Sequence, residues 1–147
     1  GKEIPQTVRQ AAALGDDPAR GDLGSIIIVV ATDAPLLPHQ LKRLARRATL
    51  GMARTGGLSG NGSGDIFLAF STANPEAFKA AGLASLQMVS NEEISPIFDA
   101  TAWATEEAIV NAMVAAETMT GADNRTVERL PHDALRDALR KYNRLAP

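Results

Sequence analysis

The chain has 147 residues, of which 45% are hydrophobic and 22% charged, the size and composition of one globular domain. Its formal charge of −2 provides no overall basic field for nucleic acid or an anionic membrane, and the lack of cysteine excludes disulfides and thiolate metal sites. No apolar stretch approaches the roughly 18 residues that a membrane-spanning helix needs, and no signal peptide is recognisable. We therefore expect a cytoplasmic protein with neither nucleic-acid nor membrane partners.

The first third of the chain predicts a helix, a loop and a strand. Residues 4–14 are typical of a short helix with proline in its first turn. Residues 15–24 contain three glycines, three aspartates and a proline, which favour an exposed, flexible loop. Residues 25–32 open the most apolar run and show no polar alternation, so we expect a strand that is buried on both faces.

The middle third predicts a helix, a glycine-rich loop and a second strand. From residue 39 to about 54, apolar residues recur at helical spacing, and the basic residues on the other side favour a solvated face rather than a nucleic-acid patch. Residues 56–64 contain five glycines and lead into an apolar strand over residues 65–72.

The last third predicts a short strand and two helices. The strand is expected near Leu86–Val89, and a long helix from about Asn91 to Thr120, interrupted near Pro96 and ended by Gly121. Its later part is apolar nearly all round, which is typical of burial between layers or against another subunit. The final helix is expected from about Pro131 to Tyr142.

Ser25 is the first candidate for chemistry. It follows Gly24 at the end of the flexible loop and begins the apolar strand. A small hydroxyl residue in this position is where an N-terminal nucleophile would emerge if the chain cut itself between Gly24 and Ser25. The alternative is a serine that only begins a buried strand.

The glycine-rich loop is the second candidate. Phosphate binding is disfavoured because the loop lacks the lysine of a phosphate-binding loop, and because it runs from a helix into a strand. What remains is a tight turn that presents Asn61, Ser63 and Asp65. Ser63 and Asp65 are two residues apart, so on a regular strand they would share a face.

Three separated motifs resemble the L-aminopeptidase/D-esterase family, which includes the β-aminopeptidases. They are Gly24–Leu36, Gly60–Ile66, and Asn124–Glu128 together with Leu130–Asp133. The match covers nearly the whole chain, as the C-terminal part of the family's precursor. The resemblance implies an α/β fold, a four-layer α/β/β/α sandwich of which this chain supplies the C-terminal part.

The resemblance also implies processing before Ser25. Residues 1–24 would be the tail of an α-subunit, and residues 25–147 a β-subunit that begins with the nucleophile. The partners would be the α-subunit from the same precursor and further αβ units in a homo-oligomer. The substrates would be small peptides, amides or esters, hydrolysed through an acyl-enzyme on Ser25.

The expected mechanism needs no histidine, metal or cofactor. Cleavage would free an α-amine on Ser25, whose pKa of about 7.7–8.0 suits a base near neutral pH. His39 and His132 then remain surface or capping residues. By the resemblance, Ser63 and Asp65 match a second serine and its acidic partner: Asp65 would accept a hydrogen bond from Ser63, which would contact Ser25.

Three questions stay open at this level. Ser63 and Asp65 could instead only hold the glycine turn, and Asn61 could donate to an oxyanion or support the loop. Two other functions also remain: an acyltransferase of the related ornithine acetyltransferase type, and a non-catalytic ligand-binding domain.

Overall fold

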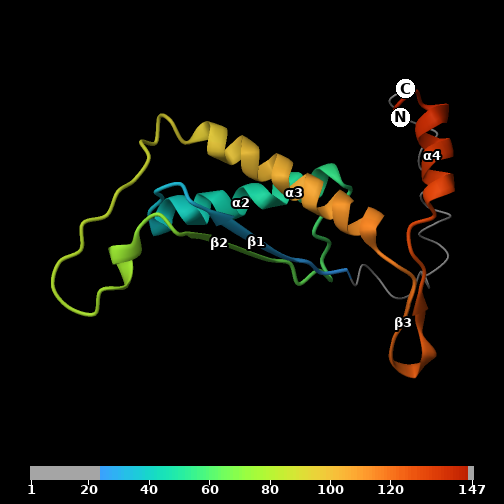
Figure 1. The fold of residues 1–147 in the computed structure, drawn as a ribbon, viewed down its shortest axis with the longest axis horizontal. Coiled ribbons are helices and arrows are strands. Elements are labelled where there is room, and N and C mark those ends of the chain that lie inside the picture. The colour runs from blue at the N-terminus through green and yellow to red at the C-terminus, as the bar shows by residue number, and fades with distance from the viewer. Residues whose placement is uncertain (1–23, 146–147) are drawn as a thin grey trace.

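The structure, a computed structural model, describes residues 24–145, so the helix predicted over residues 4–14 and nearly all of the loop that follows it lie outside the described residues. The described part is an α/β body from which a small hairpin and a last helix extend at one end (Figure 1). In chain order the elements are β1 (Ile27–Thr32), α2 (Pro38–Arg54), β2 (Ile66–Ser71), the 3₁₀ turn η1 (Pro75–Phe78), α3 (Ser95–Ala115), β3 (Met119–Thr120), the 3₁₀ turn η2 (Ala122–Asn124), β4 (Thr126–Val127) and α4 (His132–Lys141).

The body is built on a parallel pair of strands joined by a helix. β1 and β2 pair in register from Ile27 opposite Ile66 to Thr32 opposite Ser71. Parallel strands require a crossover connection, and α2 with the glycine-rich loop provides it. Both α2 and α3 lie over the same side of the sheet (Figure 1). This topology brings the start of β1 beside the start of β2.

The hydrophobic core lies between the sheet and the two helices. Leu44 of α2 is completely buried, and it packs with Leu36, Ile94 and Phe98. Burying such side chains contributes about 1.5–3 kcal/mol each, so this cluster fixes the helices on the strands. Val30, Ala34, Leu41, Ala69, Val89 and Ile97 pack around it.

Helix α2 confirms the predicted amphipathic pattern, with one difference on its basic face. Its buried positions include Leu44, Ala48 and Met52. The guanidinium groups of Arg43 and Arg47 lie 5.0 Å and 4.3 Å from the centre of the Phe98 ring. These are cation–π contacts, in which the ring face attracts the cation. Because Phe98 belongs to α3, part of the basic side of α2 packs against α3 rather than facing only water.

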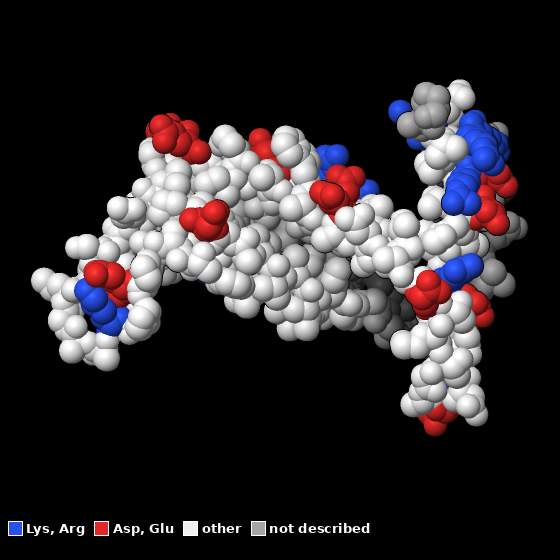
Figure 2. Space-filling model, viewed as in Figure 1, with Lys and Arg blue, Asp and Glu red and all other residues white. Residues whose placement is uncertain are grey.

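The prediction that the first strand is buried on both faces is wrong for the described residues. Exposure alternates along β1, and Ile27 and Val29 remain 70% and 54% exposed. The reason is that α2 and α3 cover one side of the sheet only. Figure 2 shows a surface without charged side chains in the lower middle of the molecule, whereas charged residues gather along α4.

The later elements also differ from the expectation. Leu86–Val89 forms no strand. The long helix is shorter than predicted and spans Ser95–Ala115. Pro96 does not interrupt it, because this proline lies in the first turn, where proline is tolerated. The chain then turns into the β3–β4 hairpin, so Gly121 lies in a turn and not at a helix end. α4 confirms the predicted last helix to within a residue at each end.

Helix α3 is not enclosed by the described chain. Phe98, Thr101 and Thr105 are buried, but Trp103 is exposed. No helix in the described part of the chain has the length and apolar character required to cross a membrane.

Candidate active site

The parallel register places Ser25 beside the last glycine of the glycine-rich loop. The Ile66 N–H donates to the Ile26 carbonyl at 2.9 Å, which aligns the two strand starts. The Gly64 N–H then donates to Ser25 Oγ at 2.9 Å. A Cβ at position 64 would lie 3.3 Å from the same oxygen, so glycine permits this close approach of backbone to hydroxyl.

Asp65 connects the chain just after Ser25 to the glycine-rich loop. Its Oδ1 accepts a hydrogen bond from the Ile26 N–H at 3.0 Å. Its Oδ2 accepts one from the Ser59 hydroxyl at 2.7 Å. Both oxygens are therefore occupied, and the carboxylate is fixed next to the residue that follows Ser25.

These contacts favour the ionised form of Asp65. The neighbouring Ser63 hydroxyl, the Ser59 hydroxyl and, to a smaller extent, the Ile26 N–H hold the pKa of Asp65 below its ordinary value of 3.8, while partial burial opposes them. Asp65 is therefore a carboxylate, able only to accept hydrogen bonds, at neutral pH.

The hydrogen bond from Ser63 to Asp65 that the family resemblance implies does not have hydrogen-bond geometry in the structure. The Ser63 side-chain oxygen is buried and has no hydrogen-bond partner among the described residues. It lies near enough to Asp65 to stabilise the charge, but its geometry is not that of a hydrogen bond. The physical reason is that β2 begins only at Ile66, so Ser63 and Asp65 lie in the turn rather than on one face of a regular strand. The Ser63 backbone closes that turn by donating to the Gly60 carbonyl at 2.9 Å.

A pocket of about 220 Å³ opens at this point. Polar groups form one wall, namely Ser25, Ser59, Ser63 and Asp65. Apolar side chains of Met52, Leu58 and Ile109 form much of the rest. Asn61 is exposed and is not part of the pocket lining. The site thus combines a serine hydroxyl, a fixed carboxylate and an apolar surface.

Neither histidine belongs to this site. His39 is exposed on the first turn of α2, and the ring of His132 lies 2.9 Å from the Val114 carbonyl oxygen. Within residues 24–145, no group of three or more His, Asp or Glu side chains could hold a metal ion.

One protein family matches most of the chain. The sequence pattern of peptidase family S58 matches residues 1–127. The chain belongs to peptidase family S58. The predicted family resemblance is thereby confirmed.

Curated members of the S58 family are similar over nearly the whole chain. The chain is 54% identical to the beta-peptidyl aminopeptidase BapA of Sphingosinicella microcystinivorans, over 99% of its own length and 37% of that protein's. It is 46% identical to the beta-peptidyl aminopeptidase BapA of Sphingosinicella xenopeptidilytica, over 92% of the chain and 35% of that protein. The chain therefore spans little more than a third of these relatives.

Solved structures of aminopeptidases superpose on this chain. The L-aminopeptidase D-Ala-esterase/amidase of Ochrobactrum anthropi, described as a variant of the Ntn hydrolase fold, matches 95% of this chain and 39% of its own, with a TM-score of 0.78 and 48% identity. A Burkholderia sp. beta-aminopeptidase matches 85% of this chain and 36% of its own, with a TM-score of 0.73 and 47% identity. The predicted α/β fold class is confirmed. Among the described residues, α2 and α3 form a helical layer on the β1–β2 sheet, and β3 and β4 form a second, two-stranded sheet.

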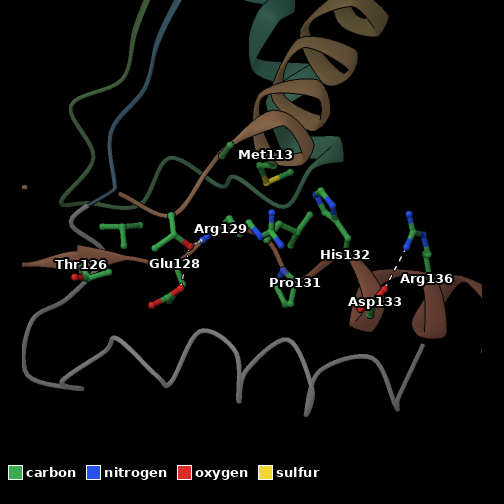
Figure 3. Close-up of a pocket in the computed structure, with 12 residues that line it drawn as sticks. Met113, Thr126, Glu128, Arg129, Pro131, His132, Asp133 and Arg136 are labelled. Atoms are coloured by element: carbon green, nitrogen blue, oxygen red, sulfur yellow. Dashed lines mark hydrogen bonds and ion pairs between the residues drawn. The ribbon is translucent and has the colours of Figure 1, made fainter. Parts of the chain in front are cut away.

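A larger cavity lies away from Ser25, between the end of α3, the β3–β4 hairpin and α4 (Figure 3). It measures about 1210 Å³. Its polar groups already bind one another: the Thr118 hydroxyl donates to Glu128 at 3.0 Å, and Arg136 pairs with Asp133 at 3.2 Å. Ser25, Ser63 and Asp65 all line the smaller pocket and none of them lines this cavity, so the smaller pocket is the better candidate site.

Sequence reasoning named Ser25, Ser63 and Asp65, and the structure brings all three to one pocket. It missed Ser59 and the Gly64 N–H, both of which contact these residues directly. The available signal was the density of glycine, which lets the loop fold back so that residues six apart meet. Backbone donors carry no side-chain signal at all.

Proposed function

We propose that this chain carries the nucleophile of a self-processing serine aminopeptidase, with Ser25 as the attacking residue. The observation that carries the proposal is the placement of Ser25 Oγ on the pocket wall, bound by the Gly64 N–H at 2.9 Å. The substrates would be small peptides, amides or esters with a free N-terminal residue. The names of the S58 relatives support a peptidase and do not favour the acyltransferase alternative.

Self-cleavage would begin with attack of Ser25 Oγ on the Gly24 carbonyl carbon. The peptide bond between the two residues breaks, its nitrogen takes the hydroxyl proton, and an ester joins Gly24 to Ser25 Oγ. Water then hydrolyses the ester, which yields a carboxylate on Gly24 and a free α-amine on Ser25. The absence of a side chain on Gly24 leaves its carbonyl open to this attack.

Peptide hydrolysis would use the same oxygen. The free amine of Ser25, with a reference pKa of about 7.7–8.0, accepts the hydroxyl proton as Oγ attacks the substrate carbonyl. The proton passes to the leaving amine, an acyl ester remains on Ser25, and water releases it. The Gly64 N–H would hold Oγ in position at the pocket wall for this attack.

Asp65 and Ser63 would hold this arrangement. Asp65 fixes the Ile26 N–H, directly after the nucleophile, and its negative charge favours the protonated amine that forms during attack. Ser63 lines the same pocket with its side-chain oxygen buried beside Asp65, and it would contact the Ser25 hydroxyl or the new amine. Asn61 would support the loop, since it lies outside the pocket lining.

The rest of the longer protein would complete the molecule. We assign residues 1–24 to an α-subunit tail and residues 25–147 to the β-subunit. The uncovered side of the sheet is apolar and is the surface on which the α-subunit would pack; its exposed residues are Ile27, Val29, Ile66, Leu68 and Phe70. A homo-oligomer of such αβ units and a cytoplasmic location complete the proposal.

Processing and activity test this function together. The full-length protein should separate into two fragments, the smaller beginning Ser25-Ile26-Ile27, as measured by intact mass and N-terminal sequencing. Ser25→Ala should remain one chain and lose peptidase and esterase turnover, because both reactions use the same hydroxyl. Ser25 is exposed, so the thermal unfolding temperature should change little.

A Ser25→Ala protein that still hydrolyses an amino-acid amide at a substantial rate would assign the chemistry to another residue. An uncut wild-type chain after prolonged incubation would contradict self-processing. Addition of an amine acceptor during turnover separates hydrolysis from acyl transfer, because an acyltransferase would form the acylated amine instead of the free acid.

A further inference from the structure

Ser59 is bound directly to the carboxylate of the candidate site. Its hydroxyl donates to Asp65 Oδ2 at 2.7 Å, a short distance typical of a hydrogen bond to a charged group. The other carboxylate oxygen is held by the Ile26 N–H at 3.0 Å. Two bonds to different oxygens fix both the position and the rotation of the carboxylate, whereas one bond would leave it free to turn.

The backbone at Ser59 is held in a conformation that serine rarely adopts. Its φ is +48°, in the left-handed region that glycine occupies without a steric penalty. Glycines surround it in the loop, at positions 56, 57, 60, 62 and 64. Glycine would adopt this backbone conformation with less strain than serine. We therefore attribute the serine at position 59 to its hydroxyl group and not to the backbone conformation.

That hydroxyl contributes nothing to the core. Ser59 is exposed to solvent and lines the pocket that contains Ser25. Its hydrogen-bond partner, the Asp65 carboxylate, itself binds the residue next to Ser25. The chain of contacts therefore runs from Ser59 through Asp65 to Ile26, and from there along the backbone to Ser25.

We propose that Ser59 is a positioning residue, which holds the Asp65 carboxylate against the backbone of the nucleophile strand during turnover. This inference rests on the proposed function. Ser59 acts through Asp65 and is not required for substrate binding.

The decisive variant is Ser59→Gly in the full-length protein. It removes the hydroxyl but relieves the backbone at positive φ, so a loss of activity cannot be attributed to strain. We expect kcat of the cut enzyme to fall about tenfold, because the free energy of a hydrogen bond to a charged group commonly corresponds to a rate change of that size. KM should stay within about twofold. Ser59→Ala should show the same loss of kcat. Ser90→Ala is the control: it removes a serine hydroxyl from an exposed turn, where that hydroxyl accepts the Glu92 N–H, and it should leave both constants unchanged.

A double-mutant cycle then shows whether Ser59 acts through Asp65. In an Asp65→Asn background, Ser59→Gly should cause little further loss, because the carboxylate that it holds is gone. Full additivity of the two losses would overturn the inference. So would a correctly cut Ser59→Gly enzyme with wild-type kcat, a loss that falls on KM alone, or failure of every Ser59 variant to fold.

The same experiment separates this inference from the proposed function. If Ser25→Ala is inactive while Ser59→Gly turns over normally, the nucleophile stands and only the positioning role fails. If Ser25→Ala stays active, the proposed function fails, whatever the Ser59 variants do.

Discussion

Asp65 is the residue on which the geometry of the site depends most. It is fixed at both oxygens, by the backbone beside the nucleophile and by the Ser59 hydroxyl across the loop. Its neighbours lower its pKa, Ser63 and Ser59 first, so it keeps its charge through the neutral range. A fixed negative charge at this position can orient a protonated amine without taking part in proton transfer.

Asp65→Asn should separate charge from shape. The amide keeps the size of the side chain and can still accept from the Ile26 N–H, but it has no charge. We expect turnover of the cut enzyme to fall by roughly 10², the lower end of what a positioned catalytic partner contributes. The thermal unfolding temperature should fall only slightly. A stable, correctly cut variant with wild-type turnover would remove Asp65 from the mechanism.

The pH dependence of stability provides the control for this variant. Because the folded state holds the pKa of Asp65 below its ordinary value of 3.8, the stabilisation by its charge is fully present above that value. It is lost as the pH falls through the lower, folded pKa. The difference in unfolding temperature between wild type and Asp65→Asn should therefore shrink at acidic pH. If Asp65 only held the turn, stability and activity would fall together at neutral pH.

At the scale of the elements, the contact between α2 and α3 positions the site. α2 leads directly into the glycine-rich loop, and the Met52 side chain at its end lines the Ser25 pocket. The helices approach closely at Gly51: a Cβ there would lie 2.3 Å from the Ala102 carbonyl oxygen and 2.6 Å from Thr105 Cβ. Neither the backbone nor a branched side chain can move aside at low cost.

Gly51→Ala should therefore destabilise the protein although alanine is the better helix former. Overpacking at a close contact costs about 1–3 kcal/mol, which outweighs the roughly 1 kcal/mol that alanine gains over glycine in a helix. Urea unfolding of the full-length protein measures the difference. Ala53→Gly, at an exposed position of the same helix, is the control for helix propensity and should cost about 1 kcal/mol. A Gly51→Ala protein more stable than wild type would show that the helices separate freely.

At the scale of the whole molecule, the described residues leave one face of the β1–β2 sheet uncovered. Both strands lack charged side chains, and Leu68 on this face remains 55% exposed. A contiguous apolar surface of this kind is typical of a face that another layer covers. The S58 relatives are almost three times as long as the chain, which leaves ample sequence for that layer.

Leu68→Lys should test whether the face is covered in the full-length protein. If the α-subunit packs on it, the charge is forced into an apolar interface, and the loss should exceed the roughly 1.5–3 kcal/mol that a buried leucine contributes. We expect a clear drop in unfolding temperature and in the yield of cut protein. Leu83→Lys is the control, because Leu83 is 98% exposed and should tolerate the charge. Equal behaviour of the two variants would mean that the sheet face stays in water.

The sequence by itself indicated Ser25, Ser63 and Asp65 as candidate site residues, and it predicted the type of the main elements β1, α2, β2, α3 and α4. Ser25 was a candidate because residues 15–24, which contain three glycines and are predicted to be a loop, end directly before a hydroxyl residue and an apolar strand. α2 and α4 were recognisable because one stripe of apolar residues at helical spacing is enough to predict an amphipathic helix. These signals depend only on residues close together in the sequence, so they can be recognised without knowing the tertiary contacts. The division at residues 24 and 25 and the partner subunit stay predictions.

Only the tertiary structure decided which of these residues meet, and how. The parallel register of β1 and β2 brings Gly64 onto Ser25, and the loop folds back so that Ser59, rather than Ser63, forms the hydrogen bond to Asp65. The tertiary structure also decided the length of α3, which ends at Ala115, and the burial of β1, which is covered on one side only. The physical reason is that hydrogen-bond partners and burial depend on neighbours distant in sequence, whereas propensity and periodicity depend on neighbours along the chain.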